Sequence, residues 1–247
     1  MEIRETMNLQ DYHEKGYILI PKLFSAEEIE AFSLECDRLL NDDIVSPENG
    51  RTPFRFGAEK FPERIDPVVD ISPFFNEVSK DQRIMDVLEQ IFKEKALLLK
   101  DKLIFKGPGV EGYTLHQDYP WGWQNYPADL VLSVSIQIDG ANADNGGIEM
   151  FDGYHDKMLT PPGKKMNFSD KEKAILDYSR QTPLETNPGD VLIFHSLTPH
   201  QSGTNTSNRW RRSLYLSYNG ESLGNERDVF YEDYMSDQPR HQGKYFK

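Results

Sequence analysis

The segment ALLLKDKLIFK (96–106) marks the point at which the spacing of apolar residues changes from the period of a helix to the two-residue period of a strand. Further short apolar or alternating runs follow, separated by turn signals such as PG, NGG and PGD: LVLSVSIQID (130–139), GGIEMFDG (146–153), DVLIFHS (190–196) and SLYLSYN (213–219). Short strands bounded by turn residues are typical of a small β-sandwich or barrel. The second half of the chain is therefore expected to form one.

The part before residue 96 is expected to be mainly helical. After a short alternating stretch at 16–24, the segment 25–40 combines Ser25 as an N-cap with an apolar side on which Cys36 is expected to be buried. The segment 81–95 has a second apolar stripe at helical spacing. Helices first and strands second, without β-α alternation, disfavour a doubly wound parallel sheet.

The 247 residues show no internal repeat, so we expect one domain over 1–247, an α+β protein that is mainly β. It is divided into a helical part (about 1–95), a β core (about 96–220) and a polar C-terminal tail (221–247). The segment 42–67, rich in proline, glycine and charge, is expected to run over the surface. The polar segment 159–187, with a helical turn around 170–178, is expected to be an insertion near the barrel mouth.

Charge and composition exclude several classes of partner. The net charge of −13, from 41 acidic and 28 basic residues, repels nucleic acids and anionic membranes, and NRWRR (208–212) is too short for a nucleic-acid footprint. No apolar run approaches the roughly 18 residues of a membrane span, and the start is too polar for a signal peptide. Cys36, the single cysteine, excludes an internal disulfide and a cysteine-based metal site. We expect a cytoplasmic protein, and we favour a monomer over an oligomer.

The stretch YTLHQDYPW (113–121) places His116 two residues before Asp118. Residues i and i+2 of a strand share a face, so the imidazole and the carboxylate can reach one ion. A third ligand must come from a strand distant in sequence, and GDVLIFHSLTPH (189–200) offers His195 and His200. Two histidines and one carboxylate suit non-haem Fe(II), whereas zinc more often takes a tetrahedral set. Spacing alone leaves the metal open.

The chain resembles the phytanoyl-CoA dioxygenase family of Fe(II)- and 2-oxoglutarate-dependent oxygenases. The matching pieces lie in the family's order from about residue 12 to 219: EKGYILIPKLFSAEEIEAF (14–32), FKGPGVEGYTLHQD (105–118), SIQIDGANADNGGIEMFDGYH (135–155) and GDVLIFHSLTPHQSGTNTSNRWRRSLYLSYN (189–219). The resemblance implies a double-stranded β-helix, a jelly-roll or cupin-like barrel, with the N-terminal helices packed on one sheet.

The resemblance also assigns residues. It makes His116, Asp118 and His200 the iron ligands and the catalytic centre, and it places four residues around 2-oxoglutarate: Arg211, Ser202, Ser133 and Lys102. Arg211, whose fork matches a carboxylate, is expected to hold the distal carboxylate, with Ser202 donating to it. Arg212 is expected on the other face of the strand, solvated or salt-bridged, and Lys106 is expected to face water.

The aromatic residues after Asp118 allow two interpretations. They either pack as core at one end of the barrel or form a lid over the substrate. On the second interpretation the substrate-binding residues are Tyr119, Trp121, Trp123 and Ser135. Two departures from the family pattern are DGYH (152–155), which makes His155 more simply structural, and Gln201, which adds bulk at a usual glycine position and is expected to narrow the mouth.

The resemblance implies hydroxylation of a C–H bond with 2-oxoglutarate and O2, and release of succinate and CO2. Because the acidic chain shows no basic patch for the phosphates of coenzyme A, a small polar metabolite is the expected substrate. The carboxylate at Asp118 favours hydroxylation over halogenation. Two alternatives stay open: a cupin-like metal isomerase or hydrolase without 2-oxoglutarate, and a non-catalytic metal-binding barrel.

Overall fold

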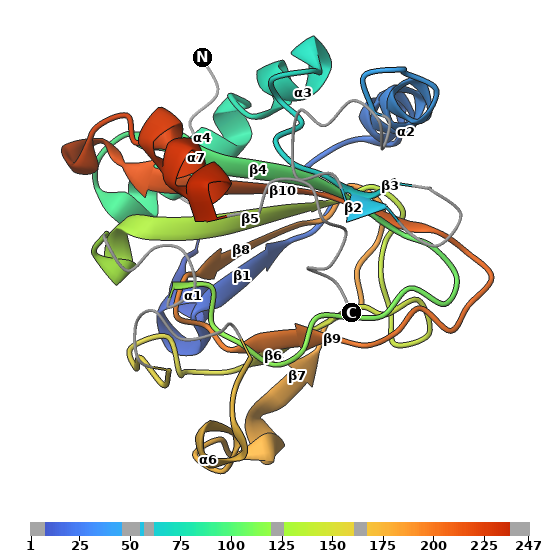
Figure 1. The fold of residues 1–247 in the computed structure, drawn as a ribbon. Helices are drawn as coiled ribbons and strands as arrows, with labels where there is room; N and C mark the ends of the chain where they lie inside the picture. Colours follow the sequence, from blue (N-terminus) through green and yellow to red (C-terminus); the bar gives the residue numbers. More distant parts are fainter. Residues whose placement is uncertain (1–7, 46–54, 57–61, 120–125, 161–166, 238–247) are drawn as a thin grey trace.

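In the computed structural model, which describes residues 8–45, 55–56, 62–119, 126–160 and 167–237, two antiparallel sheets face one another (Figure 1). The larger sheet has the strand order β1-β8-β5-β10-β4-β3-β2 and the smaller sheet the order β7-β6-β9. The larger sheet consists of β1 (Tyr17–Ile20), β8 (Val191–His195), β5 (Val131–Gln137), β10 (Arg211–Gly220), β4 (Ala96–Lys106), β3 (Pro62–Ile65) and β2 (Arg55–Phe56). The smaller sheet consists of β7 (Gln181–Pro183), β6 (Ile148–Phe151) and β9 (His200–Ser202). This arrangement is the expected jelly-roll barrel.

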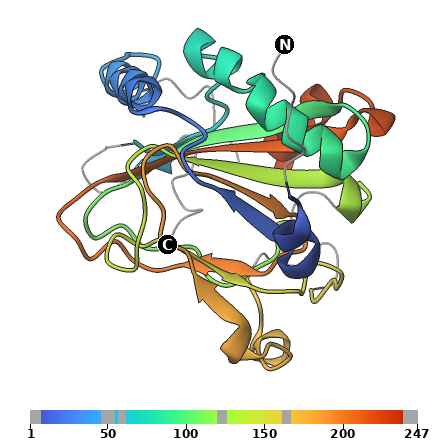
Figure 2. The same cartoon turned by 180° about the vertical axis from the view of Figure 1, so that it is seen from behind.

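Helices cover the outer face of the larger sheet, as the views from both sides show (Figures 1 and 2). They are α2 (Ala26–Leu40), α3 (Pro73–Val78) and α4 (Gln82–Phe92). The helix α7 (Arg227–Asp237) lies at the end of β4, α1 (Gln10–Lys15) precedes β1, and α6 (Asp170–Lys173) lies beyond the smaller sheet. Three 3-10 turns complete the elements, at Ala128–Leu130, Tyr178–Arg180 and Glu221–Leu223. Ser25 and Glu28 form the capping box that begins α2, and Cys36 is fully buried, so both predictions for this helix are confirmed.

The two faces of the larger sheet differ sharply in polarity. One set of alternate residues, such as Leu103, Val134 and Leu216, packs with the helices in the main hydrophobic core. The opposite set points towards the smaller sheet and is mostly polar: Lys100, Lys102, Ile104 and Lys106 of β4, Ser133, Ser135 and Gln137 of β5, and Arg211, Ser213, Tyr215 and Ser217 of β10. Burying polar groups is costly unless they are paired. We therefore look for the functional site on this inner face.

Two sequence predictions are wrong. The end of the segment 42–67 does not run over the surface, because β3 pairs with β4 and Ile65 is fully buried. The C-terminal segment is not simply a polar tail, because residues 227–237 form α7 and Phe230 is buried against Leu99 and Val131. In each case the surrounding residues are polar, and a single apolar residue, Ile65 or Phe230, makes the buried contact. Among the described residues, no helix is both long and apolar enough to cross a bilayer.

Candidate metal and cosubstrate site

Backbone pairing brings His116 and His200 together although 83 positions separate them in the sequence. Each residue donates its backbone N–H to the carbonyl of the other, at 3.0 and 2.9 Å, in an isolated antiparallel bridge at the edge of the smaller sheet. Residues directly opposite in such a pair project to the same side. The two imidazole rings consequently lie 4.2 Å apart between their centroids.

The backbone also fixes which nitrogen of each ring faces the site. Nδ1 of His116 lies 2.6 Å from the carbonyl oxygen of Thr114, and Nδ1 of His200 lies 2.9 Å from that of Thr198. A carbonyl can only accept, so Nδ1 carries the proton in both rings and Nε2 keeps its lone pair. Burial, with His116 alongside, lowers the pKa of His200 to about 4. Neutral rings with free Nε2 atoms are what a divalent metal requires.

Asp118 completes the group. Its Oδ1 lies 3.5 Å from Nε2 of His116 and 3.9 Å from Nε2 of His200, and its Oδ2 accepts a hydrogen bond of 3.2 Å from the hydroxyl of Ser133. Burial alone would raise the pKa of Asp118, but the two histidines and Lys102 outweigh it and hold the pKa below its usual range. Among the described residues, these three side chains form the one cluster able to hold a metal ion.

This donor set fits Fe(II). Two imidazole nitrogens and one carboxylate oxygen, all directed into one space, would hold the ion with three ligands and would leave its other positions for cosubstrate and oxygen. His195, the other candidate for the third ligand, is turned away, since its Nδ1 accepts the backbone N–H of Leu197 and its ring contacts His155. The prediction of His200 over His195 therefore agrees with the geometry.

A second polar group lies at the other end of the inner face, where Arg211 pairs with Lys106 across β10 and β4. Arg211 is 2% exposed, and its buried Nε has no hydrogen-bond partner among the described residues. The Oγ of Ser202 accepts from the backbone N–H of Tyr113 at 3.0 Å and from Nζ of Lys106 at 3.3 Å. An unsatisfied buried guanidinium is costly, so this end of the barrel is arranged for an anion.

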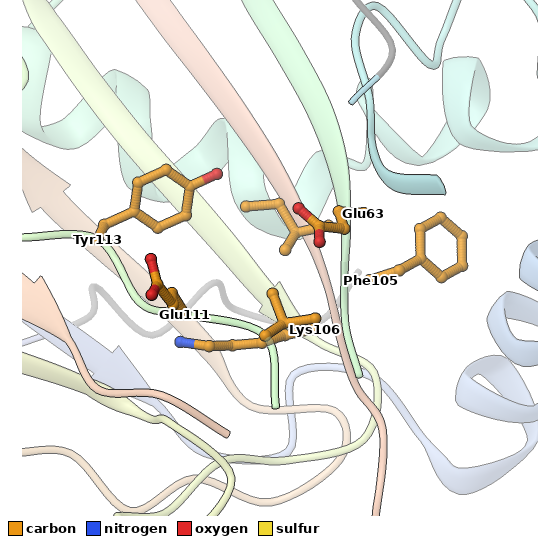
Figure 3. Close-up of a pocket in the computed structure, with 7 residues that line it drawn as sticks. Glu63, Phe105, Lys106, Glu111 and Tyr113 are labelled. Atoms are coloured by element: carbon orange, nitrogen blue, oxygen red, sulfur yellow. The ribbon is translucent and has the colours of Figure 1, made fainter. Parts of the chain in front are cut away.

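Lys106 does not face water, which corrects the sequence prediction. The side chain is 2% exposed, and its ammonium donates to the carbonyls of Gly146 and Gly203. Figure 3 shows Lys106 and Phe105 leaving β4 on opposite sides, with Lys106 lining a small pocket between β4 and Tyr113. A side chain at Gly146, which has a φ of +72°, would meet Nζ of Lys106 at 2.7 Å. Glycine there makes room for the ammonium.

The neighbouring Arg212 behaves differently from Arg211. Its Nε and Nη2 pair bidentately with Asp139 at 2.8 and 2.7 Å, and Nη2 also reaches Ser33 of α2. Successive strand residues face opposite sides of a sheet. The expectation that Arg211 faces inward and Arg212 is salt-bridged on the other face is confirmed.

The remaining predicted residues lie in different places. Lys102 is half-buried, with its ammonium 5.7 and 5.0 Å from the ring centroids of Tyr113 and Tyr215, and Ser135 is fully buried, accepting from Gln137 at 2.8 Å. Tyr119 packs partly buried against the cluster of Leu99, Val131 and Phe230. Trp121 and Trp123 lie outside the described residues.

Gln201 does not narrow the mouth. It lies between His200 and Ser202 on β9 and therefore faces the opposite way, where its amide donates to Glu149 of β6 at 2.7 Å. His155 packs on the rings of Tyr12 and His195 and does not join the metal cluster, which agrees with a structural role.

Comparison of the sequence with known proteins identifies a family. The profile of the family described as phytanoyl-CoA dioxygenase (PhyH) matches residues 12–213. The chain belongs to the phytanoyl-CoA dioxygenase family. The similar curated proteins include a 2-aminoethylphosphonate dioxygenase from uncultured bacterium HF130_AEPn_1, 32% identical over 152 residues, which are 62% of this chain and 56% of that protein. They also include a methylphosphonate hydroxylase from Gimesia maris, 27% identical over 91% of this chain and 84% of that protein.

Solved structures share the fold of this chain. The crystal structure of EctD from S. alaskensis with 2-oxoglutarate and 5-hydroxyectoine has a TM-score of 0.75 and 20% identity, and covers 86% of this chain and 74% of that chain. The phytanoyl-CoA dioxygenase family consists of iron- and 2-oxoglutarate-dependent oxygenases. The predicted fold, enzyme class and cofactors are thereby confirmed at the level of the family.

Sequence analysis missed part of the site in this family member. Lys100 and Lys106 were not expected inside the barrel, nor was Arg64 of β3, whose register partner is Ile104 of the inner face. A signal was present, because Lys100, Lys102 and Lys106 in ALLLKDKLIFK differ by even numbers and share one face of a strand. Charge alone suggested solvent, and only the second sheet turns that face into an interior.

The Ser133 hydroxyl provides a first test of the metal site. Loss of an outer hydrogen-bond partner of a metal ligand typically costs about 10- to 100-fold in metal affinity, so Ser133→Ala is expected to weaken Fe(II) binding at the lower end of that range. Ser135→Ala, two residues along the same face, removes a hydroxyl that contacts Gln137 and should leave iron affinity unchanged. Anaerobic Fe(II) titration measures both. Equal iron affinity in Ser133→Ala and wild type would contradict a role in orienting Asp118.

Proposed function

We propose that this protein is an Fe(II)- and 2-oxoglutarate-dependent dioxygenase that hydroxylates a C–H bond of a small polar metabolite, with release of succinate and CO2. His116, Asp118 and His200 hold the iron, and Arg211 with Ser202 holds the distal carboxylate of 2-oxoglutarate. The observation that carries the proposal is the presence of two features in the space between the two sheets. Three donor atoms converge at one point, and at the other lies buried Arg211, whose Nε has no hydrogen-bond partner within the described part of the chain.

The same pairing separates this function from its alternatives. A metal isomerase or hydrolase on the same barrel has no use for a dicarboxylate cosubstrate, so it has no use for a buried arginine beside the metal site. A barrel that only binds metal would not need the open side of the coordination sphere. Arg211 and Lys106 supply two cations to one end of the inner face, which suits a carboxylate ligand.

In this mechanism the protein supplies orientation and charge. Bound Fe(II), 2-oxoglutarate and O2 provide the oxidising power for C–H hydroxylation. The carbonyls of Thr114 and Thr198 keep the imidazoles in the tautomer that presents Nε2, and Ser133 fixes Asp118 with Oδ1 towards the two Nε2 atoms, where the three side chains would hold the iron. Arg211 orients the cosubstrate from the far end and neutralises its carboxylate. The helix-covered larger sheet and the smaller sheet exclude water from both.

The relatives narrow the choice of first substrates. Two of them act on short phosphonates, 2-aminoethylphosphonate and methylphosphonate. These molecules are small and polar, the class of substrate that the sequence led us to expect, and they are also acidic. The protein in this proposal is one domain and acts as a cytoplasmic monomer. It binds neither nucleic acid nor anionic membranes, because its net charge of −13 repels other polyanions.

The test is an anaerobic titration of metal-free protein with Fe(II) and then 2-oxoglutarate. A chelated 2-oxo acid on Fe(II) gives a weak visible charge-transfer band, and the proposal expects this band to saturate with one equivalent of cosubstrate. Adding O2 with 2-aminoethylphosphonate, methylphosphonate or ectoine then asks which substrate couples succinate to a hydroxylated product. Bound iron without the band would favour the isomerase or hydrolase alternative.

A pH experiment tests the place of Lys106 beside the cosubstrate. Burial, together with the charge of Arg211, lowers the pKa of Lys106 to about 7, so the side chain is mostly neutral at pH 8 and charged at pH 6. A carboxylate bound nearby favours the ammonium and raises that pKa. Binding of 2-oxoglutarate should therefore take up a proton at pH 8 but little at pH 6. Calorimetry in buffers of different ionisation enthalpy measures this uptake, and an equal uptake in Lys106→Met would refute the assignment.

A further inference from the structure

The C-terminal helix α7 is anchored to the larger sheet by two polar side chains. Arg227 contacts the carboxylate of Asp70 at 2.8 Å and the buried carboxylate of Asp101 at 2.7 Å. The hydroxyl of Tyr231 accepts the backbone N–H of Asp101 at 3.2 Å and donates to Asp66 at 3.0 Å. Asp101 belongs to β4, whereas Asp66 and Asp70 lie between β3 and α3, so α7 is held beside β4 (Figure 1).

Phe230 of α7 reaches the end of the inner face that contains the metal ligands. Its ring is 5% exposed and packs in a cluster with Val131 of β5. Val131 lies two residues before Ser133 on the same face of the strand, and the hydroxyl of Ser133 contacts Asp118. Tyr119, immediately after Asp118, packs partly buried in the same cluster. Phe230 therefore covers this end of the barrel beside a metal ligand.

Lys100 gives an independent indication of this proximity. Its ammonium lies 5.3 Å from the ring centroid of Phe230 and 3.9 Å from the carboxylate of Asp66, which Tyr231 also contacts. Burial lowers the pKa of Lys100 to about 8, and the carboxylate of Asp118 is close enough to oppose that shift. One side chain is thus a neighbour of α7 and lies within electrostatic reach of the metal ligand.

The attachment of α7 is mostly polar. Among the α7 side chains that the structure describes, those of residues 227–232, only Phe230 is buried. By contrast, α2 buries four side chains in the main hydrophobic core. An element with few buried apolar contacts opens locally at a lower free energy than the core does. We therefore expect α7 to leave the sheet more readily than α2.

A turn suited to a hinge precedes α7. Gly224 has a φ of +83° and a ψ of −178°, a combination that is open to glycine and strained for other residues. Its N–H donates to the carbonyl of Glu221, and its carbonyl accepts from the side-chain amide of Asn219, so the turn itself is fixed. The chain between this turn and α7 can absorb a change of dihedral angles while β10 stays in place.

We propose that α7 is a lid over the iron end of the barrel, hinged after Gly224, which opens to admit small ligands and closes when Phe230 packs on the inner face. The closed lid excludes water from the space beside Asp118, which strengthens the electrostatic interactions there. The inference rests on the proposed function, because that function needs ligands to enter a site that the two sheets enclose. A fixed wall that never opens is the alternative that the experiment must distinguish.

The experiment follows Fe(II) entering and leaving the full chain without oxygen. Stopped-flow absorbance measures uptake of Fe(II) by the metal-free protein and its release to 2,2′-bipyridine, and hydrogen exchange measures the opening of α7. Phe230→Ala removes the buried ring, and Arg227→Met removes the ion pairs but keeps a long side chain. Val229→Ala is the matched control, because Val229 is adjacent on the same helix and 49% exposed. Thermal unfolding shows that each variant is folded.

Both rates should rise by about tenfold to 100-fold in Phe230→Ala, because losing the burial of one phenylalanine side chain increases the open population by a factor of that size. The amides of α7 should exchange faster by a similar factor. Arg227→Met should also raise both rates, and Val229→Ala should leave them at the wild-type values. The equilibrium affinity for Fe(II) should stay within a few-fold of wild type, since a lid changes uptake and release equally and the three donor atoms are intact.

Wild-type rates in both Phe230→Ala and Arg227→Met would show that α7 is not a moving cover on the path of the ion, and the inference would be overturned. Faster release with an equal loss of iron affinity would also overturn it, because Phe230 would then support the metal ligands directly. Failure of the proposed function gives a different result. If the wild type binds iron but shows no charge-transfer band with 2-oxoglutarate, that function is wrong, while the iron kinetics still decide whether α7 is a lid.

Discussion

Replacing His200 with alanine is expected to abolish Fe(II) binding and turnover together. The substitution removes one of three donor atoms that converge within 4.8 Å of one another, and two ligands do not retain a divalent ion against water. The loss of iron affinity should exceed the roughly 10- to 100-fold that removal of an outer hydrogen-bond partner causes. Anaerobic Fe(II) titration followed by metal analysis of the desalted protein measures the effect directly.

His195→Ala is the matched control for His200→Ala. Both histidines are buried and lie five residues apart, but the ring of His195 contacts His155 and its Nδ1 accepts the backbone N–H of Leu197. The control should keep iron affinity within a few-fold of wild type, even if its thermal stability falls. If His200→Ala retained iron binding and His195→Ala lost it, the third ligand would be His195 of β8, and the assignment of His200 of β9 would be wrong.

Arg211→Ala is expected to have the second largest effect, and on a different quantity. Iron affinity should be unchanged, while 2-oxoglutarate should bind more weakly by about 30-fold to several thousand-fold, because truncating one partner of a buried charge pair costs about 2–5 kcal/mol. Arg211→Lys should recover only part of this loss, since an ammonium does not reproduce the guanidinium fork. Titrating the charge-transfer band with 2-oxoglutarate gives the cosubstrate affinity of each variant, and the anaerobic Fe(II) titration gives its iron affinity.

Arg212→Ala controls for the loss of a neighbouring arginine. Its partner is Asp139 on the opposite face, so cosubstrate affinity should stay at the wild-type value.

Thermal unfolding of the same variants adds an independent measurement. Without cosubstrate, Arg211→Ala should be no less stable than wild type, because none of the residues that the structure describes pairs with the buried Nε of Arg211. Saturating 2-oxoglutarate should stabilise wild type and Arg212→Ala but not Arg211→Ala. Equal stabilisation of all three would refute the role of Arg211.

These variants divide the site into two separable functions. The His116, Asp118 and His200 cluster is assembled by an edge bridge of the smaller sheet, whereas Arg211 and Lys106 belong to central strands of the larger sheet. A substitution in one sheet can therefore remove metal binding, and one in the other can remove cosubstrate binding, while the rest of the barrel stays in place.

The sequence by itself determined those features that depend on neighbours along the chain. The two-residue period after residue 96 predicted the strands, Ser25 predicted the start of α2, and the spacing of His116 and Asp118 predicted two ligands on one face. Strand alternation also placed Arg211 inward and Arg212 outward. Each inference needed only local geometry, which a short stretch of sequence contains.

Only the tertiary structure decided which residues from distant segments meet. Spacing alone left His195 and His200 as rivals, and the family resemblance assigned His200; the bridge of His200 to His116 shows physically why that residue meets the other two. Sequence analysis assigned Lys106 to solvent and did not mention Lys100 or Arg64, because a charged side chain on a strand is normally solvated unless a second sheet covers that face. Here the smaller sheet and α7 provide the cover, so the same alternation that suggests a wet surface produces a buried cationic site. Burial is a property of the whole fold, and no local pattern reports it.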